Sequence, residues 1–287
     1  MIYILISVCC SITVAVLLKL ARRYKIDIVQ AVTWNYLVAI ALAVLFFKPQ
    51  VNDLLQRPAP VYILLGVLLP VVFWFLAAAI KNIGIVKTDI AQRLSLFLPI
   101  LAAYFIFKEQ LSTLKVIGLA IGMVAILLTL IKRNKQHTGN ANWVYPVIVF
   151  VGFGVIDILF KQVALLKVIP YTSSLVVVFG IAFLISSIYM VTVAYQKKRR
   201  ITLINMFCGA LLGIFNFGNI LFYLKAHQAL SSNPSTVFAA MNMGVIIMGS
   251  IIGVLLFKEK LSKVNYIGLG LALMAIVCIT LSQIYVI

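Results

Sequence analysis

Residues 105–130 read FIFKEQLSTLKVIGLAIGMVAILLTL, and residues 255–280 read LLFKEKLSKVNYIGLGLALMAIVCIT. The second stretch begins 150 residues after the first, and 10 of the 26 aligned positions are identical. Apolar composition alone would match some leucine and isoleucine positions. It would not place F-K-E-x-L-S at the same point of two apolar segments, so the chain is predicted to contain an internal repeat.

The overall composition places this repeat in a membrane. The chain has 287 residues, of which 64% are apolar and 10% are charged, and its mean hydropathy is +1.16. A soluble domain has about 45–50% apolar and about 25% charged residues. These values exclude a soluble enzyme, a disordered chain and a secreted disulfide scaffold, and they predict a polytopic membrane protein.

Charge and rare residues narrow the expected partners. The net charge is +18, but the basic residues lie in short gaps between apolar runs, where they anchor helix ends and contact lipid phosphates. We therefore expect membrane lipids as partners and no nucleic acid. The four cysteines lie in apolar runs without a CxxC pair, and neither a nucleotide loop nor HExxH occurs. We expect no metal, no cofactor and no ATP-driven step.

Ten segments have about the 20 apolar residues that a membrane-spanning helix needs. They are 2–20, 29–47, 61–80, 87–107, 114–131, 143–162, 171–194, 203–224, 234–257 and 264–283. None alternates as a membrane β-strand does, so the fold is predicted to be all-α. The first segment is followed by basic residues and no small-residue cleavage site, and we expect it to be a retained span rather than a signal peptide.

The repeat divides these spans into two halves. Residues 1–131 form the first five-helix repeat, residues 132–142 a basic linker, and residues 143–287 the second repeat. Because each half has an odd number of spans, the second must cross the membrane in the opposite orientation. Inverted repeats of this kind build many secondary transporters, whose sites lie near the midplane between the halves.

Ten spans, two five-span repeats and an F-K-E-x-L-S turn followed by an I-G-L span resemble the EamA-domain branch of the drug/metabolite transporter (DMT) superfamily. The resemblance covers nearly the whole chain. It implies an inner (plasma) membrane carrier, not an enzyme, that moves small organic solutes such as amino acids, metabolites or drugs, often outward, by alternating access. Four-span members of the superfamily carry a proton-coupling glutamate in their first span. The first span here has no acidic residue, so that role has no counterpart.

Ionisable residues inside a span are costly and are therefore functional candidates. Asp157 lies well inside the sixth span and precedes Lys161 by four residues, the favoured order for an ion pair on a helix. We predict that Asp157 and Lys161 couple transport to protons or exchange. The alternative is a structural ion pair near the end of the span.

Other polar or aromatic residues within spans are predicted to bind the solute. They are Asn35, Trp74, Asp89, Gln92, Arg93, Asn216, Asn219 and Asn242. Gln92 and Asn242 lie 150 residues apart, at equivalent repeat positions, and are expected to face each other across the pseudo-two-fold axis. The alternatives are interfacial snorkelling for Asp89 and Arg93, helix packing for the asparagines of the eighth span, and a lipid-facing or core position for Trp74.

Several residues are expected to be structural. Glu109 and Glu259 end a span in each half, and Ser112 and Ser262 are expected to cap the helices that follow. His227 is expected to be interfacial. Two mid-span prolines, Pro70 and Pro99, can kink their helices and act as hinges, or simply fit the packing.

The orientation and the function are left with alternatives. Gaps after odd-numbered spans hold 16 lysines and arginines and gaps after even-numbered spans hold 7, which places both termini outside, whereas the family resemblance places them inside. The favoured function is a proton- or exchange-coupled secondary transporter, as a monomer or homodimer. The alternative is a flippase for a lipid-linked intermediate, with Lys19 and Lys161 seating the headgroup.

Overall fold

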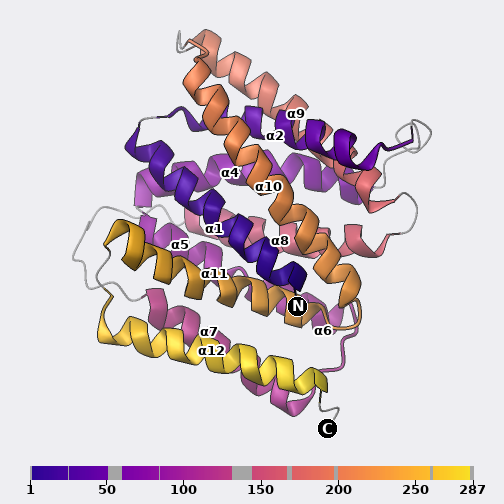
Figure 1. Ribbon diagram of the computed structural model, residues 1–287, viewed down its shortest axis with the longest axis vertical. Coiled ribbons are helices and arrows are strands. Elements are labelled where there is room, and N and C mark those ends of the chain that lie inside the picture. The colour runs from indigo at the N-terminus through magenta and orange to yellow at the C-terminus, as the bar shows by residue number, and fades with distance from the viewer. Residues whose placement is uncertain are drawn as a thin grey trace.

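A computed structural model of the protein describes residues 2–24, 26–50, 60–83, 85–130, 144–166, 170–196, 200–258 and 261–284, all as helices and short connections (Figure 1). The first half contains α1 (Ile2–Arg23), α2 (Ile28–Phe47), α4 (Pro60–Ile83), α5 (Ile85–Leu94), α6 (Phe97–Phe105) and α7 (Thr113–Leu130). The second half contains α8 (Val144–Leu165), α9 (Tyr171–Gln196), α10 (Leu203–Ala229), α11 (Pro234–Phe257) and α12 (Lys263–Ile284). The linker 132–142, Glu259 and the side chain of Asp89 lie outside the described part.

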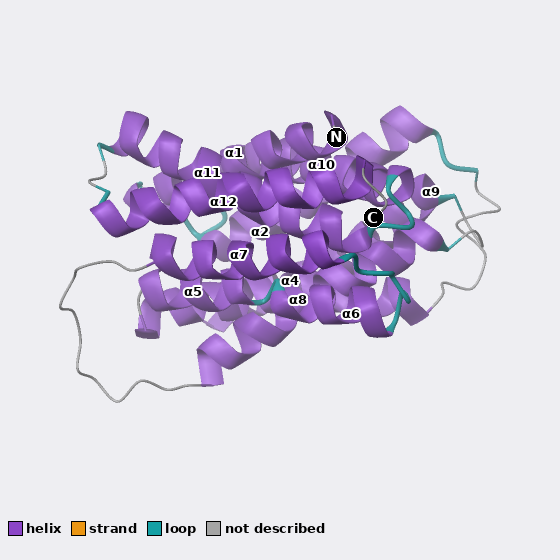
Figure 2. Ribbon diagram, turned by 90° about the horizontal axis from the view of Figure 1, so that it is seen from below, coloured by secondary structure: helices purple, strands orange, loops and turns teal. Residues whose placement is uncertain are grey.

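The helices are those of a multi-pass membrane protein. Among the described residues, eight helices are long and apolar enough to cross a membrane, and Ala91–Phe105 and Thr113–Thr129 are shorter apolar segments. These ten segments match the ten predicted spans. Turned by 90°, the bundle shows its helices running along one common direction (Figure 2). Each helix satisfies its backbone hydrogen bonds internally, as a segment in lipid must.

The two halves pack as inverted repeats. Helices α7 and α12, which carry the I-G-L sequences, lie side by side along one edge of the bundle in both views (Figures 1 and 2). Helices α2 and α9, which are also equivalent in the two repeats, contact each other as well. Cross-half contacts come in matched pairs: α1 packs on α10 and α4 on α8, while α10 packs on α2 and α4 on α9. Exchanging the halves leaves this pattern of contacts unchanged.

One predicted span is broken. The segment 87–107 was expected to be a single helix, but α5 ends at Leu94 and α6 begins at Phe97. Pro99 explains the break, because its ring excludes the carbonyl of residue 95 from the usual helical hydrogen bond. That carbonyl accepts instead from the Leu98 amide at 3.0 Å. The equivalent helix α11 has Gly249 at the repeat position of Pro99 and stays continuous.

The lysine of the F-K-E turn has the same backbone conformation in both halves. Lys108 and Lys258 occupy equivalent positions and both adopt the left-handed region, with φ of 51° and 52°. The turn in the first half is closed by hydrogen bonds from Phe107 and Glu109 amides to carbonyls of α6, at 2.9 Å each. A left-handed residue satisfies the last carbonyls of a helix in this way. The sequence repeat is thus also a repeat of local structure.

Candidate solute-binding cavity

A cavity of about 300 Å³ lies between the two halves, at the low end of the volumes typical of small-molecule sites. Helices α1, α4 and α5 of the first half and α8, α10 and α11 of the second line it. The lining residues are Ser11, Val14, Ala15, Leu18, Leu69, Val72, Phe73, Leu76, Gln92, Arg93, Ser95, Phe153, Ile156, Asp157, Phe160, Asn216, Asn219, Ile220, Tyr223, Met241, Asn242 and Val245. Most of these positions are near the middle of their helices.

The cavity collects many of the polar residues that the sequence singles out. Six of them line it: Gln92, Arg93, Asp157, Asn216, Asn219 and Asn242. Gln92 and Asn242, expected to face each other across the repeat axis, lie along the same cavity from α5 and α11. Gln92 and Arg93 directly precede the break between α5 and α6, and discontinuous helices are the usual carriers of transporter sites.

The asparagines are anchored from behind by residues outside the cavity. Asn216 donates from Nδ2 to Oδ1 of Asn35 on α2, at 3.1 Å. The hydroxyl of Ser7 on α1 lies 2.7 Å from Oδ1 of Asn219. Asn242 donates to the carbonyl of Phe238, one turn earlier on α11, at 3.0 Å. Each amide uses part of its hydrogen-bonding capacity within the protein, which fixes its position against the cavity.

The acidic residue of the cavity is Asp157. Its Oδ1 accepts a hydrogen bond of 3.1 Å from the hydroxyl of Tyr223 on α10. The sequence analysis missed Tyr223, although it lies four residues after Asn219 and therefore on the same helix face. A carboxylate inside the membrane needs hydrogen-bond donors. A tyrosine hydroxyl on the same helix face as Asn219 was the sequence signal that could have identified Tyr223 as such a donor.

Aromatic and thioether side chains form the apolar walls. Phe73, Phe153 and Phe160 line the cavity together with Met241. The ring of Phe160 meets that of Tyr223 edge-on, with 6.0 Å between centroids. The site therefore offers charged and amide groups on some walls and apolar surfaces on others, which suits a small solute with a polar end and an apolar side chain.

Three predicted site residues lie outside the cavity lining. Asn35 is 4% exposed and supports Asn216 from behind. Trp74 lies on α4 and packs against Tyr189 of α9, with ring centroids 4.1 Å apart. Lys161 is completely buried beyond the cavity. The side chain of Asp89, the eighth solute-binding candidate, is outside the described residues.

The expected ion pair between Asp157 and Lys161 does not form. The Lys161 ammonium donates instead to the carbonyl of Ser231, at 2.8 Å, and lies 3.4 Å from that of His227. These carbonyls belong to the end of α10, where a helix presents unpaired acceptors and partial negative charge. Lys161 thus binds the carbonyls at the end of α10, and Asp157 binds the Tyr223 hydroxyl, in place of the ion pair that their spacing suggested.

His227, near the end of α10, is enclosed by other side chains of the protein. It is completely buried, and its ring packs edge-on against Tyr223 and Phe238, with centroids 4.7 Å from each. Within the described part of the chain, neither ring nitrogen has a hydrogen-bond partner. Lys161 and His227 therefore close the bundle on the side of the cavity where α10 ends.

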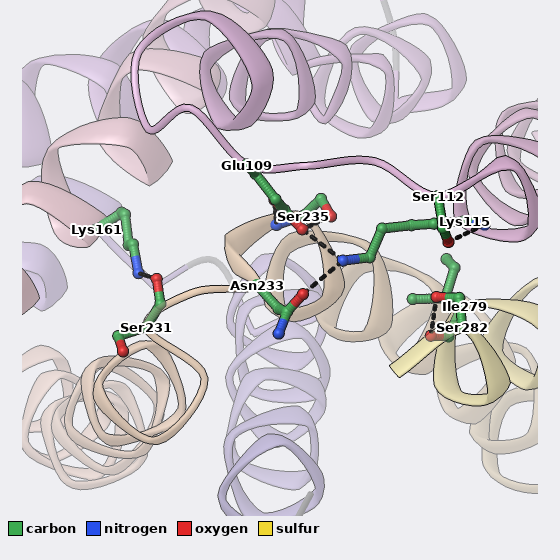
Figure 3. Close-up of polar contacts among 9 residues, drawn as sticks. All are labelled: Glu109, Ser112, Lys115, Lys161, Ser231, Asn233, Ser235, Ile279 and Ser282. Carbon is green, nitrogen blue, oxygen red and sulfur yellow. Dashed lines mark hydrogen bonds and ion pairs between the residues drawn. The ribbon is translucent and has the colours of Figure 1, made fainter. Parts of the chain in front are cut away.

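The glutamate of the first F-K-E turn joins the two halves. Glu109 forms an ion pair of 2.6 Å with Lys115 and accepts hydrogen bonds from the amide and hydroxyl of Ser235, at the start of α11 (Figure 3). The structural role expected of Glu109 is therefore present, but the helix it caps belongs to the other half.

The serines of both turns cap the helices that follow them. Ser112 accepts a hydrogen bond from the Lys115 amide at 3.4 Å, and Ser262 accepts one from the Asn265 amide at 3.2 Å, as expected for caps.

Comparison with known proteins agrees with this architecture. The profile of the EamA-like transporter family matches residues 1–131 and 141–281. The chain belongs to the EamA-like transporter family. This is a family of transporters rather than of enzymes, and membership implies a small-molecule solute. The two matched regions correspond to the two halves of the inverted repeat.

A relative and a solved structure are similar to this EamA-like chain over nearly its whole length. An uncharacterized protein from Haemophilus influenzae (strain Rd) is 41% identical over 285 residues, which cover 96% of each chain. One crystal structure of a protein superposes with a TM-score of 0.74 at 15% sequence identity, covering 98% of this chain and 96% of that one. At this identity the superposition shows the fold alone.

Proposed function

We propose that this EamA-like transporter moves a small zwitterionic solute, such as an amino acid, through the cavity by alternating access. The proposed direction is export, as the family resemblance implies. The observation that carries the proposal is the lining of one cavity by both inverted halves. The cavity presents Arg93 and Asp157 together with four amide side chains and aromatic walls. A guanidinium suits a carboxylate, and a carboxylate suits an ammonium group.

The polar groups are distributed between the halves in a way that suits transport. Arg93 and Gln92 come from the first half, whereas Asp157 and the asparagines come from the second. A zwitterion held between them would contact both halves at once. Rearrangement of one half against the other would then change its contacts and open the other side of the membrane.

Asp157 is the proposed coupling residue. It lines the cavity, and its described partner is the Tyr223 hydroxyl rather than a cation. Binding of a proton or of the ammonium group of a solute to the same carboxylate would make the two events exclusive, which is the basis of exchange. Lys161, the other coupling candidate, is buried against helix-end carbonyls and supports the end of α10 instead.

A ligand screen followed by transport assays tests this proposal. Purified protein is screened by thermal shift against amino acids, nucleosides, sugar phosphates and cationic dyes, because a ligand that binds the native state raises Tm by an amount that grows with the ratio of its concentration to its Kd. Hits are then assayed as substrates in proteoliposomes with and without a pH gradient. Stabilisation by amino acids and their uptake support the proposal, whereas stabilisation by cationic dyes alone would contradict it.

The lipid-linked alternative receives less support. That hypothesis requires Lys161 to bind a lipid headgroup. Lys161 is instead completely buried, and its ammonium donates to the carbonyl of Ser231. Copurification of a phosphorylated lipid that is displaced by no soluble solute would restore the alternative.

A further inference from the structure

We propose that Glu109 is a latch that holds the cavity closed at the end of the bundle where α6 ends and α11 begins. This inference rests on alternating access in the proposed function. The latch consists of Glu109 and Lys115 from the first half and Asn233 and Ser235 from the second (Figure 3). It therefore crosses the boundary along which the halves must separate for the cavity to open at this end.

Both carboxylate oxygens of Glu109 accept hydrogen bonds from the second half. Oε1 lies 2.6 Å from the Lys115 ammonium and 2.6 Å from the Ser235 hydroxyl, and Oε2 accepts from the Ser235 amide at 2.9 Å. The N-cap residue of α11, Asn233, makes no capping bond with its own side chain. Glu109 supplies the missing acceptor from the other half, at the positive end of the helix dipole.

The latch lies away from water. Glu109 is 5% exposed, Lys115 is 3% exposed and Ser235 is fully buried. A buried ion pair depends on complete hydrogen bonding, and removal of one partner leaves the other as an uncompensated charge. Opening this end would separate Glu109 from Ser235 and Lys115 from Asn233, so the hydrogen bonds between the halves would be lost together, which favours the closed state.

A second set of contacts holds the same connection between α10 and α11. Lys115 also donates to Oδ1 of Asn233 at 2.7 Å, and Lys161 donates to the carbonyl of Ser231 at 2.8 Å (Figure 3). The short segment between the two helices is thus bound by lysines from α7 and from α8. Together with buried His227, these contacts lie between the cavity and this end of the bundle.

The repeat-related end of the bundle lacks the same partners. Residue 265, equivalent to Lys115, is an asparagine that donates to carbonyls of Leu128 and Thr129 on the neighbouring α7. The residues equivalent to Asn233 and Ser235 are Ile83 and Ile85, which have no polar side-chain group. The latch is therefore a feature of one end, and an otherwise symmetric pair of repeats is biased toward a state closed at that end.

Accessibility of the cavity from each membrane face tests the latch without any solute. The reporter is Ser11→Cys, in the cavity, in a background with the four native cysteines replaced by alanine. Its reaction rate with a membrane-impermeant methanethiosulfonate is measured in right-side-out and inside-out vesicles. Gln110→Cys, next to the latch and exposed, identifies the face that carries Glu109. The test variant is Glu109→Gln, and the matched control is Asn265→Ala.

We expect Glu109→Gln to raise the reaction rate at the Glu109 face by about tenfold, within the usual range of conformational coupling, and to lower it at the opposite face. Asn265→Ala should change neither rate. Equal rates with and without Glu109→Gln, or a rise at both faces, would overturn the proposal, since a rise at both indicates general loosening.

A milder variant covers the case in which Glu109→Gln fails to reach the membrane. Ser235→Ala removes one hydroxyl from the latch and keeps the ion pair, and it should change the rates in the same directions by about threefold, as expected for one hydrogen bond. No change with Ser235→Ala would then overturn the latch. Because no solute is used, this result is independent of whether the proposed solute class is correct.

Discussion

The hydroxyl of Tyr223 on α10 donates a 3.1 Å hydrogen bond to the carboxylate of Asp157 on α8, and both residues line the cavity between the halves. The two helices belong to the same repeat. Asp157 thus has one oxygen bonded to Tyr223 and belongs to the lining of the cavity. Two of the predictions below, for Asp157→Asn and Tyr223→Phe, concern this hydrogen bond.

Replacement of Asp157 by asparagine should separate coupling from transport. Asp157→Asn keeps an oxygen that accepts from Tyr223 but cannot exchange a proton. We expect uphill flux driven by a pH gradient to fall by at least about tenfold, a typical minimum effect of losing a proton-transfer group. Exchange of labelled solute across proteoliposomes without a gradient should persist at saturating solute, although loss of the carboxylate charge lowers the affinity for the solute. Unchanged gradient-driven flux in Asp157→Asn would remove Asp157 from the coupling step.

Loss of the Tyr223 hydroxyl should act through Asp157. Tyr223→Phe keeps the ring that packs on Phe160 and His227 but leaves the carboxylate without this donor. Because Asp157 is the proposed coupling residue, loss of its hydrogen-bond donor should change the pH profile of transport. The profile is measured as initial rate against pH, with Tyr195→Phe, an exposed tyrosine on α9, as the control. A profile that is the same in both variants would show that Tyr223 does not act on Asp157.

The amide pair at equivalent repeat positions should contribute to solute affinity. Asn242→Leu replaces a cavity amide that is bonded to its own helix, so the fold should be retained while solute affinity falls by about five- to tenfold, as for one lost hydrogen bond. Gln92→Leu should have a similar effect from the first half. Affinity is measured as the solute concentration that gives half-maximal transport. Equal affinity in both variants and the wild type would exclude this pair from the site.

Much of the fold and part of the site follow from the sequence. The ten segments and the inverted repeat come from hydropathy and from the duplicated F-K-E-x-L-S turn, which the backbone angles of Lys108 and Lys258 repeat. Polar residues deep in a span must face protein or water, which is why the asparagines of α10 reach the cavity. Six polar lining residues were named from the sequence on the basis of this cost of exposing a polar group to lipid.

Choices between alternative partners could not be derived from spacing. Lys161 lies one turn after Asp157, but the carbonyls at the end of α10 accept its protons, and only the tertiary packing brings them near. Asn35 is a polar residue inside a span, as a solute-binding residue would be, but its side chain accepts a hydrogen bond from Asn216 outside the cavity lining. The break after Leu94 had a signal in Pro99, which the sequence analysis treated as a kink within one helix.

The close approach of α10 to α2 should make one glycine essential for stability. A Cβ added at Gly213 would lie 2.7 Å from the Asn35 carbonyl oxygen, whereas one added at Gly249 would meet nothing within 4 Å. Gly213→Ala should therefore lower the free energy of unfolding by about 1–3 kcal/mol, as overpacking does. Gly249→Ala should be neutral or stabilising, since alanine favours a helix over glycine by about 1 kcal/mol. The comparison is made by thermal unfolding of the purified variants in detergent, and equal losses would contradict the helix contact.

Binding of the solute identified by thermal shift, measured for wild-type protein and for the double variant Asn216→Leu/Asn242→Leu, tests most directly whether the cavity between the halves is the transport site. Both substitutions remove amides from the cavity and leave its apolar walls in place. We predict a concentration-dependent rise in Tm for the wild type that is lost in the double variant, while the Tm of the two proteins without solute stays within a few degrees. An equal rise in both proteins would show that the solute binds elsewhere and would contradict the account.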